Sequence, residues 1–443
     1  MRLPGTSGHR VSRVWDVAAT TGAVGELGEQ LASLGVGRVT VESTSDYWRI
    51  WYYLLEAAGL SVQLVNARDV KNVPGRPKSD KLDAVWLAKL TEKGLLRPSF
   101  VPPAPVRQLR DYTRLREDLT RERSRYWQRL EKLLEDALIK VSSVASTLDT
   151  LSVRDMLEAL IAGERDPRRL AELARGRLKT KRSALIAALD GRFDAHHAEL
   201  ARMLLDQIDT LTAQIGVLTA RIEQLIAAMD EPDRGREHRG GVPNVAALTG
   251  DTAADVEPEH GGDGRSAGFD ISVDTIAECT RLTAIERLDE ITGVGERAAQ
   301  TIIAEIGLDM TRFPTPEHLV SWAKLCPRTI QSGPISRAGR TGKGNPYLKG
   351  ALGEAAAAAA RTDTFLGERY RRIVKRRGKL KALVAVARSI LRIVWHLLAN
   401  PTARFHDLGL DYHTSRAVTE RKIRNHIAHL TAMGFHVTLE PAA

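Results

Sequence analysis

The chain has 443 residues, with 65 Lys and Arg against 55 Asp and Glu, a net charge of +10 and two cysteines. This length exceeds what one hydrophobic core usually organises, so we expect two or three domains. The basic excess favours a polyanionic partner. Cys279 and Cys326 form no CxxC or Cys/His cluster, which excludes a disulfide framework and a structural zinc site and fits a reducing, cytoplasmic setting.

The sequence pattern predicts no membrane span. The first thirteen residues contain no apolar signal-peptide core, and the most apolar late stretch, residues 380–399, is interrupted by Arg388 and Arg392. We therefore expect no membrane among the partners.

Residues 36–67 alternate between strand and helix patterns. Residues 38–42 and 61–65 are typical of short strands, and residues 46–58 between them are typical of a helix. Strands joined in this way are expected to lie parallel. Glu42 would then lie at the carboxyl end of the first strand, where open α/β sheets hold their sites.

Two aspartates, Asp80 and Asp83, lie one turn apart at a predicted helix start, with Ser79 as a plausible N-cap. They share one face and, with Glu42, resemble most of a metal site. Acids in a first helical turn are also favoured by the helix dipole, so two ordinary solvated residues remain an alternative.

A basic helix is predicted over residues 106–141, after the proline-rich residues 102–105. Residues 107–132 contain nine Lys/Arg and five Asp/Glu, a balance that leans toward phosphate.

A second helical stretch is predicted over residues 181–229, where His196 and His197 are interpreted as exposed polar residues rather than ligands. Its apolar positions follow a coiled-coil spacing: Leu204, Ile208, Leu211, Ile215, Leu218, Ile222 and Leu225. Such a seam predicts pairing with another helix or with another protomer.

Residues 231–274 contain eight glycines, three prolines and ten acidic residues against four basic ones, which predicts a mobile acidic linker. The segment 288–307 then shows two helical patterns joined at Gly293-Val-Gly295, which resembles a helix-hairpin-helix. Amides at the second helix's start can hold a DNA phosphate. A structural turn between helices would look similar.

Residues 326–346 form a glycine-rich, basic segment that offers Ser332 between Gln331 and Gly333. Five Lys/Arg and no acids between Arg328 and Lys349 make a good phosphate surface. A lone serine is ordinarily just a loop residue. Further on, residues 361–392 hold eleven basic and two acidic residues beside an apolar stripe, so one face should pack and the other meet nucleic acid.

Together these motifs resemble the DEDD-type transposases of the insertion-sequence-110 family. The resemblance spans most of the chain in collinear order and is carried by residues 39–44, 65–76, 78–84, Gly293-Val-Gly295, 331–333 and 343–345. It implies an α/β plus α architecture: an RNase H/RuvC-like catalytic domain over residues 1–105, basic helices and a coiled coil over 106–230, the linker over 231–274, and an all-helical transposase domain with a helix-hairpin-helix over 275–443.

The resemblance also implies a DNA recombinase that uses four acids, a divalent cation such as Mg²⁺ and a serine that becomes joined to DNA. The matching positions are Glu42, Asp80, Asp83 and Ser332, with Ser336 and Ser321 as rival nucleophiles. DNA contacts are expected from Gly293, Gly295, Arg297, Arg337, Arg340 and Lys343.

Implied partners are the DNA of the element ends and target, a structured bridge RNA that guides the enzyme, and further copies of the chain as a dimer or tetramer. The implied setting is the bacterial cytoplasm, at the nucleoid. Ser332 lies far along the chain from the acids, so we expect a composite site between protomers, which complementation of Glu42→Ala by Ser332→Ala subunits would test.

The family pattern begins with a strand that supplies a first aspartate, and the chain matches only after that strand. Asp16 belongs to the later Thr-Thr-Gly region, so it is not assigned this role. We therefore expect either an active recombinase with a longer true start or a non-catalytic remnant that binds nucleic acid. A nuclease without serine chemistry is a third alternative. Upstream genomic sequence would separate the first two.

Overall fold

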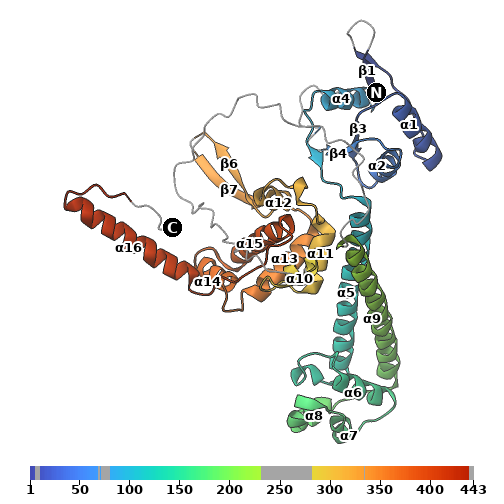
Figure 1. The fold of residues 1–443 in the computed structure, drawn as a ribbon. Coiled ribbons are helices and arrows are strands. Elements are labelled where there is room, and N and C mark those ends of the chain that lie inside the picture. The colour runs from blue at the N-terminus through green and yellow to red at the C-terminus, as the bar shows by residue number, and fades with distance from the viewer. Residues whose placement is uncertain (5–9, 68–69, 71–79, 231–281, 334, 439–443) are drawn as a thin grey trace. The chain divides into compact units, whose positions relative to one another are not determined.

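The computed structural model describes most of the chain as two compact units, Met1–Pro103 and Ala104–Ala443 (Figure 1). The described residues are 1–4, 10–67, 70, 80–230, 282–333 and 335–438. The predicted linker 231–274 and the segment 73–79 lie outside them.

A three-stranded sheet in the order β3-β4-β5 forms part of the first unit. Strands β3 (Val39–Ser43) and β4 (Val62–Asn66) are parallel and are joined by helix α2 (Trp48–Ala57). β5 (Pro98–Ser99) pairs with β4 in the antiparallel sense. The predicted β-α-β unit is confirmed, and with it the mixed α/β class of this part of the chain.

Helices α1 (Thr21–Ser33) and α2 pack together beside the sheet. Their shared core contains four buried residues: Val24, Leu31, Leu55 and Leu60. A Cβ at Gly28 would lie 2.9 Å from the Cβ of Ala58, so the close contact between these segments requires glycine.

A pair of strands and one helix are the further described elements of the first unit. β1 (Arg2–Pro4) and β2 (Arg10–Ser12) form an antiparallel pair, and α4 (Asp80–Glu92) packs against β1 and β3. Arg2 donates a hydrogen bond from Nε to Glu92 Oε2 at 2.6 Å, which ties the end of α4 to β1.

A long antiparallel helical hairpin begins the second unit (Figure 1). Helices α5 (Ala104–Asp136) and α9 (Ala195–Asp230) run side by side, and Arg123 Nη1 donates to Thr212 Oγ1 at 3.2 Å between them. The buried positions of α9 are Ala201, Leu205, Ile208, Leu211, Ile215, Leu218, Ile222 and Ile226. The predicted seam therefore packs against a helix of the same chain.

Shorter helices close the far end of this hairpin. They are η1 (Val141–Ser143), α6 (Leu151–Ile161), α7 (Pro167–Glu172), η2 (Gly176–Lys181) and α8 (Arg182–Leu189). The prediction of one continuous helical stretch over residues 181–229 is wrong, because the chain breaks between α8 and α9. A Cβ at Gly191 would lie 2.6 Å from the carbonyl oxygen of Ala137, and the Arg192 N–H donates to that oxygen at 2.8 Å.

The C-terminal part of the second unit is mostly helical. Its helices are α10 (Ala284–Asp289), α11 (Glu296–Ile306), η3 (Met310–Arg312), α12 (Pro316–Trp322), α13 (Pro346–Ala359), α14 (Phe365–Arg377), α15 (Lys379–Ala399) and α16 (Tyr412–Ala432). Side chains that accept backbone N–H groups begin five of them: Thr283, Asp309, Thr315, Asn345 and Thr364.

Helix α15 is the centre of this helical group, since α10, α12, α13 and α14 all pack against it. Within the described ranges, it is the one helix long and apolar enough to cross a membrane by length and composition, but 56% of its most apolar window is buried in the protein. A core helix passes the same test, so this finding is weak support for a membrane span.

The prediction of an all-helical C-terminal domain is wrong at one place. β6 (Pro327–Ser332) and β7 (Ile335–Thr341) form an antiparallel hairpin where the sequence suggested an irregular basic loop. Gly333 adopts φ +56° at the tight turn, a conformation that favours glycine, and the β-branched residues Thr329, Ile330 and Ile335 suit strands.

Candidate catalytic and nucleic-acid-binding sites

Glu42 lies one residue before the end of β3, where the register pairs it with Val65 of β4. The parallel β3-α2-β4 connection puts the carboxyl ends of both strands at one edge of the sheet. Glu42 is half-buried at that edge. The position predicted for this carboxylate from the strand pattern is the one that the structure has.

Helix α4 carries the two predicted aspartates. Asp80 is its first residue and Asp83 its fourth, and Asp83 is half-buried with Oδ1 shielded from solvent. The side chain of Asp80 lies outside the described set. The helix start is thus where the sequence pattern put it.

A pair of hydroxyl groups fixes α4 against β3. Thr40 Oγ1 and Thr91 Oγ1 are 2.6 Å apart, and Gln63 Nε2 donates to Thr40 Oγ1 at 2.7 Å. Glu42 lies two residues beyond Thr40, about 7 Å along the strand. Asp83 lies two helical turns before Thr91, about 12 Å along the helix.

These acids suit a hard divalent cation by the chemistry of their donors. Carboxylate oxygens are the ligands that Mg²⁺ prefers. Asp16 lies near the start of α4, because its carboxylate accepts a hydrogen bond from exposed Lys81 at 2.8 Å, and this bond raises the pKa of Lys81 above its usual range.

Ser332 is the last residue of β6, and the register pairs it with Ile335 across the turn at Gly333. Ser336 follows in β7, together with Arg337 and Arg340. The side chains of these residues and of Ser332 lie outside the described set. Among the rivals, Ser321 is exposed on α12.

The segment after β7 is anchored through a buried carboxylate. Glu305 is fully buried on α11 and accepts hydrogen bonds from Arg114 Nε at 2.8 Å and Nη2 at 2.9 Å. Asn345 donates to the same carboxylate and also begins α13. Lys343 remains exposed beside this anchor. The sequence reading missed Glu305, because an acid on an amphipathic helix gives no signal of a partner elsewhere in the chain.

The turn between α10 and α11 is tightly packed on one side. Gly293 has φ +88°, and a Cβ there would lie 2.3 Å from the carbonyl oxygen of Ala355 on α13. Arg297 reaches α5, where it donates to Thr120 and lies 3.8 Å from Glu117. Gly295 has open space beside it. Packing thus accounts for Gly293 and engages Arg297, which favours the structural alternative for this turn.

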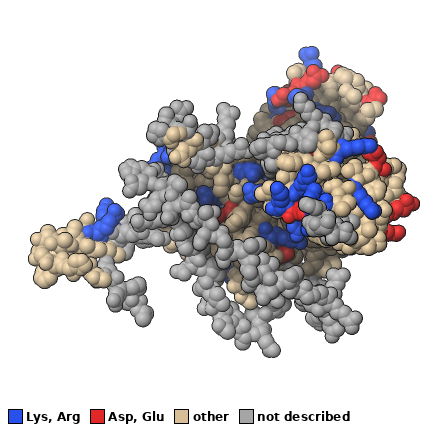
Figure 2. All heavy atoms as spheres, turned by 90° about the horizontal axis from the view of Figure 1, so that it is seen from above, with Lys and Arg blue, Asp and Glu red and all other residues tan. Residues whose placement is uncertain are grey.

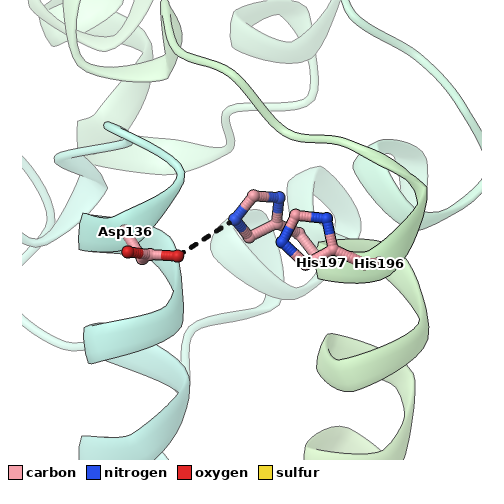
Figure 3. Close-up of side chains that lie close together, drawn as sticks. All are labelled: Asp136, His196 and His197. Atoms are coloured by element: carbon pink, nitrogen blue, oxygen red, sulfur yellow. Dashed lines mark hydrogen bonds and ion pairs between the residues drawn. The ribbon is translucent and has the colours of Figure 1, made fainter.

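Asp136, His196 and His197 meet where α5 ends and α9 begins, and their ligand atoms all lie within 4.8 Å of one another (Figure 3). The Asp194 N–H donates to His197 Nδ1 at 3.1 Å. Nδ1 is therefore an acceptor, and Nε2 carries the proton that it donates to Asp136 at 3.4 Å.

This arrangement fits a hydrogen-bonded clamp better than a metal site. A metal ion on His197 Nε2 would move the proton to Nδ1, where it would meet the Asp194 N–H. The bond instead resembles a capping box, in which a side chain accepts from the residue that precedes the helix. His196 is exposed as predicted, whereas His197 is 5% exposed, so that prediction is wrong for His197.

On the face that Figure 2 shows, the basic side chains of the described residues do not form one uniform patch. Figure 2 shows lysine and arginine side chains interspersed with acidic ones over the described part of the visible surface. A nucleic-acid surface must therefore be identified from the contacts of each lysine and arginine, and not from the net charge of +10.

Comparisons with known proteins match both parts of the chain. A family model described as "Transposase" matches residues 6–139, and one described as "Transposase IS116/IS110/IS902 family" matches residues 285–371. The "Insertion element IS110 uncharacterized 43.6 kDa protein" of Streptomyces coelicolor is 34% identical over 118 residues, which are 26% of this chain and 29% of that relative. The matched segment thus spans less than a third of the relative's length.

Proposed function

Because the chain belongs to the IS110 family of transposases, we propose that it is the DNA recombinase of an insertion sequence, which cleaves and exchanges strands at the element ends and target. The observation that carries this proposal is the acid set of the first unit. Glu42 lies at the carboxyl end of β3, and Asp83 lies on the helix that Thr40 and Thr91 hold against that strand.

Glu42, Asp80 and Asp83 would hold the divalent cation. The cation would supply charge stabilisation at the scissile phosphate. The contribution of the chain is rigidity, since the Thr40–Thr91 contact and the Gln63 hydrogen bond fix the strand that carries Glu42 relative to α4. Pre-organised ligands of this kind lower the cost of ordering the site.

Ser332 is the proposed nucleophile. Its Oγ would form a bond to a DNA phosphorus while the bond from phosphorus to the leaving strand breaks, and the leaving oxygen would take up a proton. The covalent link conserves the phosphodiester energy, so that a second strand can later displace the serine. Support comes from the Gln331-Ser332-Gly333 context and from the location of Ser332 at a strand end beside a tight turn.

A structured guide RNA is proposed as the second nucleic-acid partner. The support is the family resemblance together with the basic segments of the second unit, which suit a phosphate backbone of either kind. The helix seam of α9 is occupied by α5, so assembly into a dimer or tetramer would use other surfaces.

The test is a covalent trapping assay with the full chain, duplex DNA carrying the element end, the transcript of the element's non-coding end and Mg²⁺. We expect a protein–DNA adduct that resists SDS. It should disappear with EDTA, in Glu42→Gln and in Ser332→Ala, and remain in the control variant Ser321→Ala.

Two results would overturn the proposal. An adduct that survives Ser332→Ala but is lost in Ser336→Ala would move the nucleophile to β7. Tight binding of DNA and RNA without any cleavage or adduct would instead favour a protein that only binds nucleic acid.

A further inference from the structure

Four arginines gather where α14 and α15 pack together. Arg369 and Arg372 are three residues apart on α14, and Arg388 and Arg392 are four residues apart on α15, so each pair shares a helix face. Gly378, with φ +79°, ends α14 and begins α15. We call these four residues the arginine cluster.

The arginine cluster is partly removed from solvent. Arg369 is half-buried, and its Nε is shielded from solvent without a hydrogen-bond partner among the residues that the structure describes. The Arg392 side chain is 19% exposed. Burial and the like charges of Arg372, Arg388 and Arg392 lower the pKa of Arg369 below its usual range.

Acidic side chains balance this charge incompletely. Glu317 of α12 forms an ion pair with Arg392, with Oε1 3.2 Å from Nη2, and Glu368 of α14 favours the charged form of Arg369. Helices α14 and α15 contain ten lysines and arginines and one acidic residue, Glu368, and His396 adds a titratable group beside Arg392. The packing of α14 against α15 therefore brings together an excess of positive charge.

The ion pair between Arg392 and Glu317 joins α15 to α12, whereas the neighbouring arginines repel one another. α15 packs mainly through buried apolar residues such as Ala382, Val386, Ile390 and Val394. Mutual repulsion between guanidinium groups opposes folding. A bound anion would offset that repulsion, and rigid helices would present the arginines to it without further ordering.

We propose that the arginine cluster binds the sugar-phosphate backbone of a nucleic acid. Guanidinium groups match phosphate oxygens with two parallel hydrogen bonds, which suits a site that fixes position rather than sequence. DNA and RNA share this chemistry. The inference rests on the proposed function insofar as a nucleic acid is the partner, but it requires no catalysis.

The test measures binding of the full chain to two fluorescent probes, a DNA duplex of arbitrary sequence and an RNA hairpin, by anisotropy in EDTA between about 50 and 200 mM salt. Each phosphate contact adds about 0.9 to the salt slope for duplex DNA. We expect Arg372→Gln/Arg388→Gln to lower that slope by about 2. Arg372→Gln alone, at an exposed position, should lower it by about 1.

The matched control is Arg168→Gln/Arg177→Gln, which removes two exposed arginines from the far end of the helical hairpin. We expect the control to keep the wild-type slope. If the salt slope of the cluster variants falls with both probes, the site binds the backbone of DNA and RNA alike. If the slope falls with one probe alone, the site is assigned to that nucleic acid.

Thermal unfolding without nucleic acid separates binding from a structural role. We expect the cluster variants to melt no lower than the wild type, and sulfate to raise the melting temperature of the wild type more than theirs. Unchanged slopes, or equal losses in the control, would overturn the inference. If the Glu42→Gln protein keeps the wild-type salt slope but forms no adduct with DNA, loss of catalysis is separate from nucleic-acid binding. The assignment of the arginine cluster then does not depend on the catalytic proposal.

Discussion

Helices α5 and α14 are both rich in arginine, but they use it differently. On α5, Arg110 and Arg114 bind Glu305, and Arg116 donates to Gln300, so these charges hold α5 against α11. On α14 and α15, the arginine cluster lies among ten basic residues and a single acidic one, Glu368. A count of basic residues therefore does not identify a nucleic-acid surface; the partners of each residue do.

The same contrast extends along the helical hairpin. Arg154 makes two hydrogen bonds to Asp209, at 2.9 and 2.7 Å, and also pairs with Glu158 at 2.8 Å. Arg154 on α6 is thus paired within the protein, as are Arg110 and Arg114 of the basic helix predicted after residue 105.

The largest expected effect comes from the buried partner on the α5 side of this contrast. Glu305→Gln leaves Arg110 and Arg114 without their carboxylate, and we expect the free energy of unfolding to fall by about 3–5 kcal/mol. Urea denaturation followed by circular dichroism measures it. Glu172→Gln, which removes an exposed partner of Arg182, is the control and should cost less than about 1 kcal/mol. Equal effects in the two variants would contradict the interpretation.

A smaller effect is expected where the charges are unbalanced. Glu317→Gln removes the carboxylate that pairs with Arg392, so stability should fall by at most about 1 kcal/mol, because Glu317 is 53% exposed. Affinity for duplex DNA should rise by about two- to fivefold, as the excess positive charge grows. Anisotropy titration at fixed salt measures the change. Weaker binding would speak against the arginine cluster as a phosphate site.

A still smaller loss of stability is expected when a paired surface carboxylate is removed. The hydrogen bond from Arg202 lowers the pKa of Glu158 below its usual range. A lowered carboxyl pKa adds stability above the unfolded value near 4.5, and this stability is lost as the pH falls through the folded pKa. We expect Glu158→Gln to cost under about 1 kcal/mol at neutral pH, since its side chain is 36% exposed. In pH-dependent melting, the difference from wild type should vanish in acid; a difference independent of pH would point to packing instead.

The smallest effect is expected at His396. Burial and the charge of Arg392 lower its pKa below the usual value of 6.5, whereas Glu317 acts in the opposite direction. A lowered histidine pKa means that the unfolded chain binds the proton more readily, so stability is complete above pH 6.5 and declines as the pH falls through the folded pKa. Melting at pH 7.5 and 5.5 should show a smaller difference for His396→Gln than for wild type. An equal difference would remove His396 as the cause.

Local pattern predicted the elements that depend on neighbouring residues. The alternation around Val39 and Val41 gave β3, the turn before Asp80 gave the start of α4, and the spacing of α9 gave its buried face. Local pattern could not choose a partner for that face. The choice of α5 depends on two segments that are far apart in the chain.

The missed features depend on tertiary contacts. The helix break near Gly191 follows from its approach to Ala137, and the importance of Glu305 follows from Arg114, 191 residues earlier. His197 was predicted to be exposed because its neighbours in sequence are largely polar. Its contact with Asp136 depends on the tertiary structure. Of the candidate site, Glu42 and Asp83 were placed correctly on their elements, whereas their catalytic roles remain a prediction.

The ion pairs of Glu305 fix the N-terminal part of α5, so a small rotation there displaces the opposite end of the helix. The 33 residues of α5 span about 50 Å. Arg110 and Arg114 hold the N-terminal end, or base, of this helix, and its C-terminal end, or tip, lies far from them. A tilt of about 5° at the base carries the tip about 4 Å. Asn345 binds the same Glu305 carboxylate and begins α13. A movement of α5 at Glu305 would therefore also move the start of α13.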